Sequence, residues 1–129
     1  MRIALSISIV TLTAFSCVKK DVKISNEKVY SLSVKKSLEY YNNSNSIFLD
    51  VRTEEEYEEN HISGSISFPL DEIDYRANEL ARFKEKDIIV YCRSGRRSES
   101  ASIILRDHGF DVMNMEGGIL QWKGPTVSK

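Results

Sequence analysis

The sequence contains few cysteines and histidines, two of each in 129 residues, and its formal net charge at pH 7 is −1. With so few thiolate and imidazole ligands, a transition-metal site is not expected. Because the charge is nearly balanced, the chain has no overall basic field that would attract nucleic acid. Its length suits one compact domain with a single core and is too short for two.

Charged residues are also missing from Ile3 to Ser16, a run that follows Arg2 and ends before Lys19. This apolar run is too short to span a bilayer comfortably, and it is typical of a secretory signal peptide. A buried first strand or helix is the alternative interpretation. We therefore expect residues 1–16 to be a signal peptide and the protein to be exported across the cytoplasmic membrane.

Two cleavage routes are compatible with the residues around Cys17. Ala14 and Ser16 fit the small-residue rule of ordinary signal peptidase. The stretch LTAFSC also resembles a bacterial lipobox, although Ala14 stands where leucine is usual. On the second route Cys17 carries the lipid, and the protein is a membrane-anchored lipoprotein on the periplasmic or cell-envelope side. Cys92 is then the one free thiol, and no disulfide within the chain is possible.

Beyond a polar tether at 17–28, apolar runs alternate with turn signals from residue 29 to residue 124, and 125–129 is expected to be a C-terminal tail. Strands alternating with helices predict an α/β domain with a mainly parallel sheet. The expected strands are Val29–Ser33, Ile47–Val51, Ile66–Phe68, Ile88–Tyr91 and Phe110–Met113. The expected helices are Val34–Tyr41, one opened by a capping box of Thr53 and Glu56, Leu70–Phe83, Ser98–His108 and a short one in GGILQW.

The most reactive segment of the sequence is expected at Cys92, directly after a buried strand and ahead of a helix. Ligands bind at this edge in open α/β sheets, where loop N–H groups and the helix N-terminus favour an anion. Such surroundings lower a cysteine pKa, so a thiolate is present at neutral pH without a histidine base. An inert buried cysteine is the alternative. The loop residues expected to surround the thiol are Arg93, Ser94, Gly95, Arg96, Arg97 and Ser98.

The same loop could in principle bind a tetrahedral oxyanion, as in a cysteine phosphatase or an arsenate reductase. That chemistry requires the pattern C-x5-R, in which the arginine closes a ring around the oxyanion. Counting from Cys92, the required position is occupied by Ser98, and Arg97 comes one residue early. Tyr91 also replaces the histidine that usually precedes a phosphatase cysteine. Loop length therefore argues against this class.

Three segments in order resemble single-domain rhodaneses, and the likeness runs from about Val29 to Gly124. They are LDVRTEEEYEENHISGSISFPL, the loop YCRSGRR and the C-terminal MEGGILQW. The resemblance implies a rhodanese-like domain at 29–124 with a central parallel sheet and helices on both faces. It implies that Cys92 takes a sulfane sulfur from a small anionic donor such as thiosulfate and passes it to a thiol or cyanide. No metal or organic cofactor is required.

In this interpretation the backbone from Arg93 to Ser98 holds the outer sulfur of a persulfide, and the arginines attract the anionic donor. Asp50 and Arg52 are expected to support the loop rather than to react. His61 is expected to be structural, and His108, beside Gly109 at the end of a helix, has no catalytic role. A rhodanese-like module that binds or senses without turnover remains an alternative.

Overall fold

The computed structural model describes residues 28–128. The predicted signal peptide, the lipidation site Cys17 and all but the last residue of the tether lie outside the described residues. The strands are β1 (Ser31–Ser33), β2 (Ser46–Asp50), β3 (His61–Ile62), β4 (Ile66–Ser67), β5 (Asp87–Tyr91), β6 (Val112–Glu116) and β7 (Thr126–Val127). The helices are α1 (Val34–Tyr41), α2 (Glu54–Glu59), α3 (Ile73–Arg76), α4 (Arg96–Asp107) and α5 (Gly118–Gln121), with 3₁₀ segments η1 (Leu70–Glu72) and η2 (Ala77–Phe83).

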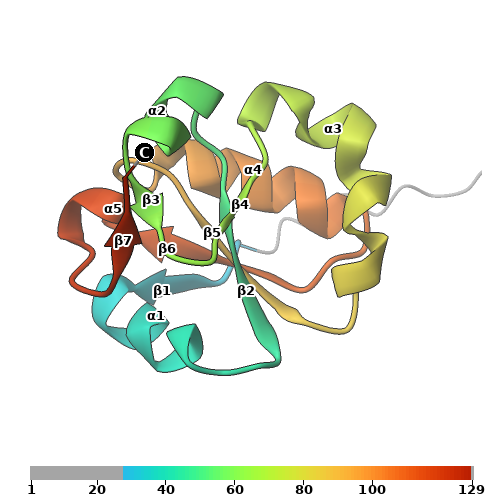
Figure 1. Cartoon of the computed structure of the whole chain (residues 1–129). Helices are drawn as coiled ribbons and strands as arrows, with labels where there is room; N and C mark the ends of the chain where they lie inside the picture. The colour runs from blue at the N-terminus through green and yellow to red at the C-terminus, as the bar shows by residue number, and fades with distance from the viewer. Residues whose placement is uncertain (1–27, 129) are drawn as a thin grey trace, which may run out of the picture.

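The central sheet has five strands in the order β1-β6-β5-β2-β4, and every neighbouring pair is parallel (Figure 1). The predicted α/β architecture with a mainly parallel sheet is therefore confirmed. Parallel neighbours require crossover connections, which the helices supply. No helix in the described part of the chain is long and apolar enough to cross a membrane.

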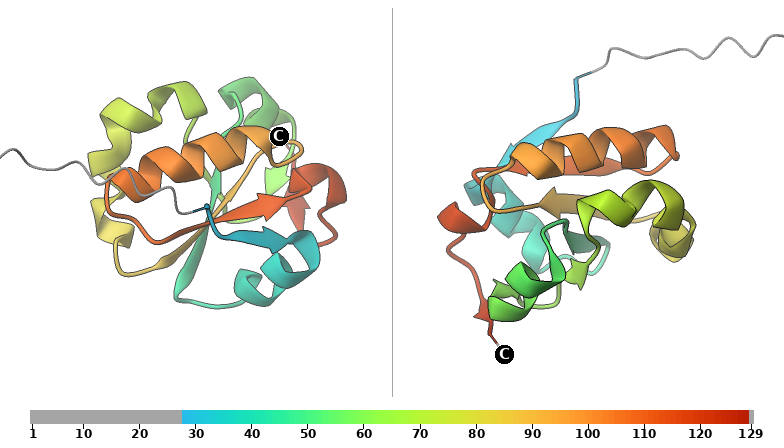
Figure 2. Two further views of the ribbon diagram at one scale, coloured as in Figure 1. Left: turned by 180° about the vertical axis from the view of Figure 1, so that it is seen from behind. Right: turned by 90° about the horizontal axis from the view of Figure 1, so that it is seen from above.

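Helices cover both faces of the sheet, and each face has its own core. Residues of α3 and α4 pack on one face with Leu49, Ile88 and Val90. Residues of α1 and α5 belong to the side that includes Phe48 and Ile89. Figure 2 shows α4 lying across the sheet when the molecule is seen from behind. Because both faces are covered, the middle residues of β2 and β5 are apolar on both faces rather than alternating with polar residues.

Alternation along β5 decides which way the candidate nucleophile points. Ile88 and Val90 belong to the core beneath α3 and α4, whereas Ile89 and Tyr91 belong to the opposite core. Successive strand residues point to opposite faces, so Cys92 follows Val90 and joins the core beneath α4. The thiol is thereby placed at the carboxyl end of the sheet, under the start of that helix.

Local signals set several boundaries. The predicted capping box is confirmed, since the Thr53 side chain accepts from the Glu56 N–H and the Glu56 side chain accepts from the Thr53 N–H. Strand β6 begins at Val112 and not at Phe110, because Phe110 is part of the motif that caps α4 after its last residue, Asp107. The Phe110 N–H donates to the Leu105 carbonyl, and Gly109, with φ of +87°, donates to Arg106. This is a Schellman motif, which uses glycine in the left-handed conformation.

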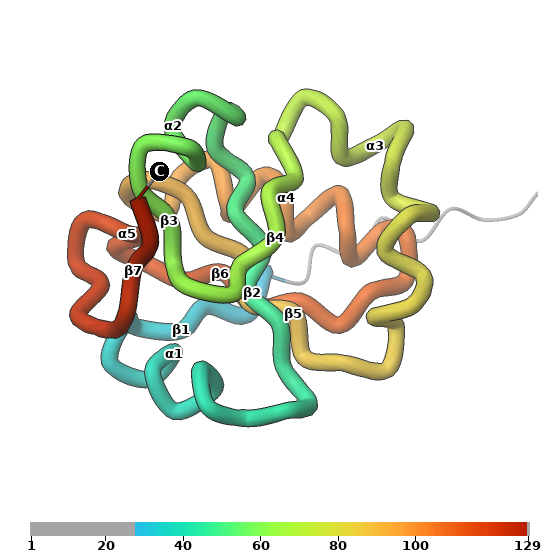
Figure 3. The backbone as a smooth tube through the Cα atoms, viewed as in Figure 1, coloured from blue at the N-terminus to red at the C-terminus, as the bar shows by residue number. Residues whose placement is uncertain are grey.

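Two further regions differ from the sequence-based expectation. The helix predicted over Leu70–Phe83 is divided into η1, α3 and η2. Apolar residues spaced three and four apart fit 3₁₀ turns as well as α-turns, so the spacing could not separate the two. The tail predicted at 125–129 contains a strand, β7, which pairs antiparallel with β3 (Figure 3). A pairing between segments so distant in sequence has no local signature.

Candidate functional site

The loop Cys92–Gly95 joins the buried end of β5 to the first turn of α4. The Cys92 side chain is 1% exposed. Gly95 is the residue that turns the chain into the helix, with φ of +104°, a conformation that side chains disfavour. Its N–H donates to the Cys92 sulfur at 3.1 Å. The turn therefore aims a backbone donor at the thiol.

Hydrogen bonds around the Cys92 sulfur favour its ionised form. Burial alone would raise the pKa of the thiol, but it is outweighed by the Ser98 hydroxyl and by the backbone N–H groups of Ser98, Gly95 and Ser94. The net result is a pKa below the ordinary cysteine value. The Ser98 oxygen lies 3.4 Å from the sulfur and is itself fully buried. A thiol whose pKa is lowered in this way is ionised more readily than an ordinary cysteine, which is the property a nucleophilic cysteine needs.

The outer side of the loop rests on the first turn of α5. A Cβ atom added to Gly118 would lie 2.3 Å from the Arg93 carbonyl oxygen, so only glycine fits there. The N–H of Ile119 donates to the Cys92 carbonyl at 2.9 Å, and that of Leu120 donates to the Arg93 carbonyl at 3.2 Å. Because these carbonyls are held outward, the loop N–H groups are free to face inward.

The three arginines of the loop have different surroundings. Arg93 and Arg96 are exposed. The Arg97 guanidinium binds the Glu56 carboxylate through two hydrogen bonds, of 2.7 and 2.8 Å. We expected the loop N–H groups, the helix start and the three arginines to favour Cys92 ionisation together. Hydrogen bonds from Ser98 and the loop backbone are the principal groups that lower the pKa of Cys92. The positive charge of Arg97 is largely offset by Glu56.

Glu56 is held in its ionised form by this contact. The Arg97 hydrogen bonds hold the pKa of the Glu56 carboxyl at about 2, against an ordinary 4.5; burial opposes the effect, and the Thr53 N–H adds to it. A single carboxylate thus closes the capping box of α2 and anchors the start of α4. The first of these roles can be predicted from the sequence, and the second cannot, since Glu56 and Arg97 are far apart in sequence.

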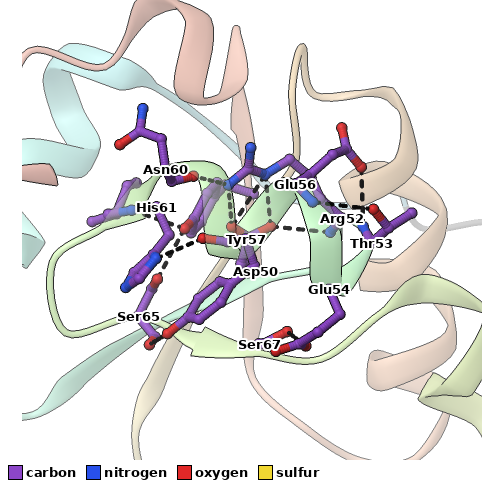
Figure 4. Close-up of polar contacts among 12 residues, drawn as sticks. Asp50, Arg52, Thr53, Glu54, Glu56, Tyr57, Asn60, His61, Ser65 and Ser67 are labelled. Carbon is purple, nitrogen blue, oxygen red and sulfur yellow. Dashed lines mark hydrogen bonds and ion pairs between the residues drawn. The ribbon is translucent and has the colours of Figure 1, made fainter. Parts of the chain in front are cut away.

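Asp50 and Arg52 form a buried ion pair beside the loop, with 2.6 Å between the guanidinium and the carboxylate. Arg52 also donates to the Asn60 carbonyl at 2.6 Å, as Figure 4 shows. Between them, the Val51 N–H donates to the carbonyl of Tyr91, the last residue of β5 before Cys92. The Asp50–Arg52 pair therefore ties the end of β2 to the end of α2 at Asn60.

Asn114 is a second residue that sequence analysis missed. It lies in the middle of β6, and only 2% of it is exposed. Its Oδ1 is 2.6 Å from the Ser98 hydroxyl, and its Nδ2 donates to the Gly95 carbonyl at 3.3 Å. A single polar residue in the apolar run VMNM was the available signal, because buried amides need partners.

Each of the two histidines has a hydrogen-bond partner within the fold. The His61 ring stacks on Tyr57 with 3.8 Å between ring centroids, and its Nδ1 lies 2.7 Å from the Tyr57 carbonyl. His108 lies 2.9 Å from the Asp74 carboxylate. Over residues 28–128, no group of three His, Cys, Asp or Glu side chains is arranged to hold a metal ion.

A pocket of about 270 Å³ opens between the end of β2, the segment before η1 and the first turn of α4. Its walls are mostly apolar, and the Arg97 side chain forms part of its rim beside the Cys92 loop. The lining residues are Val51, Arg52, Thr53, Pro69, Leu70, Asp71 and Arg97.

These features define a class of protein, an α/β domain that presents a cysteine in an anion-stabilising loop at the carboxyl edge of a parallel sheet. Residues 33–125 match the family described as rhodanese-like domain. The chain belongs to the rhodanese-like domain family.

Individual relatives agree with this assignment. Thiosulfate sulfurtransferase PspE of Escherichia coli K12 is 34% identical over 80 residues, which is 62% of this chain and 77% of PspE. The crystal structure of a rhodanese-related protein from Thermoplasma volcanium has a TM-score of 0.70 and 28% identity, covering 78% of this chain and 99% of that one. YrkF of Bacillus subtilis is 46% identical over 79 residues, 60% of this chain, but the match spans only 42% of YrkF.

Proposed function

We propose that this protein is a sulfurtransferase that carries a sulfane sulfur on Cys92. The observation that supports the proposal most strongly is the pair of donors that face the Cys92 sulfur, the Gly95 N–H and the Ser98 hydroxyl. These donors stabilise an anion without a histidine base, as a persulfide cycle requires. Relatives named sulfurtransferase and thiosulfate sulfurtransferase support the same activity.

In the first half-reaction, the Cys92 thiolate attacks the outer sulfur of thiosulfate. A bond forms between Sγ and that sulfur, the sulfur–sulfur bond of thiosulfate breaks, and sulfite leaves with the electron pair. In the second half-reaction, a thiolate or cyanide attacks the outer sulfur of the persulfide, and the Cys92 thiolate is regenerated. Splitting the transfer into two displacements gives ping-pong kinetics. Both steps balance without an external oxidant or reductant.

The donor and the acceptor are proposed to reach Cys92 from the side where Arg93 and Arg96 are exposed. Exposed cations raise the local concentration of an anionic donor, and this attraction weakens with salt. The apolar pocket beside Arg97 is wide enough for a small organic thiol. These features support thiosulfate or another anionic sulfur donor, and a small thiol as acceptor.

Phosphatase or arsenate reductase chemistry is less well supported. An oxyanion ring needs an arginine at the sixth position after the cysteine, and Ser98 stands there with its hydroxyl turned to Cys92 and Asn114. Arg97, the nearest alternative, is bound by Glu56. Sulfur transfer needs donors for a single sulfur atom, and the loop provides these.

Steady-state turnover of thiosulfate with cyanide tests the proposal. We expect parallel lines in double-reciprocal plots at several cyanide concentrations and no turnover by Cys92→Ser. Aryl-phosphate hydrolysis should be negligible beside it. An inactive wild-type protein with intact fold would favour the alternative of a module that binds or senses without turnover.

We also propose that the protein is exported and anchored to a membrane by a lipid on Cys17. The uncharged run at 3–16 and the TAFSC sequence support export and lipid attachment at Cys17. Since β1 runs parallel to β5, Lys28 enters the domain at the sheet edge opposite to Cys92. An anchor on that side would leave the reactive edge facing away from the membrane. Cys17→Ala should release the protein from membranes; retention of this variant would refute the lipid anchor.

A further inference from the structure

The Ser98 hydroxyl has two candidate acceptors but only one proton. Its oxygen lies 2.6 Å from Asn114 Oδ1 and 3.4 Å from Cys92 Sγ. A hydroxyl can donate one hydrogen bond at a time. All three side chains are buried, so water does not supply a substitute donor. Whichever atom receives the proton therefore deprives the other.

The orientation of the Asn114 amide follows from its second partner. Nδ2 faces the Gly95 carbonyl at 3.3 Å, and only a donor can satisfy a carbonyl. Turning the amide over would set two acceptors, Oδ1 and the Gly95 oxygen, against each other. Oδ1 must therefore face Ser98, where it can only accept. The short distance of 2.6 Å indicates that the hydroxyl proton lies on this side while Cys92 is a neutral thiol.

We propose that Asn114 is a positioning residue that competes with Cys92 for the hydroxyl proton of Ser98. When Cys92 is a thiolate, the hydroxyl rotates about its Cβ–Oγ bond toward the sulfur. When Cys92 is a thiol, the hydroxyl turns back to Asn114, and its oxygen can accept from the S–H. No covalent bond changes in this rotation. Asn114 thus holds the reactivity of the thiol below what the loop alone would give.

The competition also has a consequence for the cycle, which rests on the proposed sulfurtransferase function. In the persulfide the negative charge lies on the outer sulfur, so Sγ no longer needs the Ser98 proton. The hydroxyl can then return to Asn114, while the loop N–H groups hold the outer sulfur. Asn114 in this way stabilises the persulfide relative to the free thiolate.

A double-mutant cycle on the rate of iodoacetamide alkylation against pH tests the competition. Leucine has the branching of asparagine and no acceptor, so Asn114→Leu leaves the Ser98 proton to the sulfur. We expect the midpoint pH to fall by about half a unit, which is about threefold faster alkylation below the midpoint. In the Ser98→Ala background, Asn114→Leu should give no such fall. The difference between the two backgrounds isolates the shared proton.

Other charged groups stay constant in this comparison. Arg97, whose charge interacts with Cys92, remains paired with Glu56, and the Asp50–Arg52 pair is unaltered. A change of midpoint that is equal in both backgrounds would overturn the proposal, whichever its direction, because it would reflect packing alone. Circular dichroism establishes that each variant is folded.

If Asn114→Leu does not fold, Asn114→Val removes the same acceptor with a smaller side chain that suits a strand and provides the same test. The midpoint should fall in the wild-type background and not in Ser98→Ala. Equal changes in the two backgrounds would reflect packing only and would refute the competition. Alkylation does not require sulfur transfer. If the wild-type protein has no thiosulfate turnover, the proposed sulfurtransferase cycle is refuted, but the alkylation experiment still tests the competition for the Ser98 proton.

Discussion

Replacing Glu56 with glutamine should have two effects. It should weaken the ion-pair contact between α2 and α4, and it should lower the alkylation midpoint of Cys92 in the loop. The Glu56 pKa falls from 4.5 to about 2 because of Arg97. At about 1.4 kcal/mol for each pH unit, this corresponds to roughly 3 kcal/mol as an upper limit. The carboxylate and guanidinium side chains are 28% and 35% exposed, so solvent screening reduces the value to about 1–2 kcal/mol. Glutamine can still accept from the Thr53 N–H, so the capping box is retained.

Urea unfolding at several pH values measures this effect. A carboxyl whose pKa is depressed by folding stabilises the protein above the unfolded pKa, and that stability is lost as pH falls through the folded value. The difference between wild type and Glu56→Gln should therefore be full at pH 6–7 and shrink between about pH 4.5 and 2. Glu55→Gln removes an exposed carboxylate from the same helical turn and serves as the control.

The same variant has a predicted effect on Cys92. Without Glu56, the Arg97 charge is no longer offset, and the charge of Cys92 already interacts with it. The alkylation midpoint of Cys92 should fall in Glu56→Gln and stay unchanged in Glu55→Gln. A stability difference that is independent of pH, or an unaltered midpoint, would refute the assigned role of the Glu56–Arg97 pair.

Three further outcomes are expected. Gly118→Ala should lose most turnover and at least about 2 kcal/mol of stability, because its Cβ would collide with the Arg93 carbonyl at 2.3 Å; urea unfolding and kinetics measure both. Tyr91→Phe should cost about 1–3 kcal/mol in urea unfolding, since the buried hydroxyl is the partner of the Ile62 N–H and of Ser65. Inserting one glycine between Gly95 and Arg96 should impair thiosulfate turnover, because it moves Ser98, whose hydroxyl now lies 3.4 Å from the sulfur, one position further from Cys92; undiminished turnover would contradict the proposed geometry.

Features encoded by neighbouring residues could be predicted from the sequence. Apolar runs separated by amphipathic segments were enough to predict the parallel sheet and the place of Cys92 at its edge. The capping box at Thr53 and the helix end at Gly109 were readable because cap residues act on N–H and carbonyl groups a few positions away.

Contacts between distant segments could not be predicted in this way. Glu56 and Arg97 are 41 positions apart, and Ser98 and Asn114 are 16 apart. Strand β7 pairs with a segment more distant still. Each contact depends on which elements the fold brings together, and periodicity carries no information about that.

The surroundings of Cys92 also combine features set by neighbouring residues with a contact between distant segments. The loop N–H groups and the helix start were expected to stabilise the thiolate because Cys92 follows a strand and precedes a helix, and the arginines were expected to add to them. In the folded protein the sulfur is surrounded by Ser98 and backbone donors, and the charge of Arg97 is offset by Glu56. The backbone donors could be predicted from the order of elements along the chain, whereas the pairing of Arg97 with Glu56 depends on contact between distant segments.

Intact-mass measurement after incubation with thiosulfate tests the central claim most directly. We expect wild-type protein to carry one additional sulfur atom, peptide mapping to locate this atom on Cys92, and cyanide to remove it. Cys92→Ser should carry no such adduct. A folded wild-type protein that gains no cyanide-labile sulfur, or gains it on another residue, would contradict the assignment of Cys92 as the sulfur carrier.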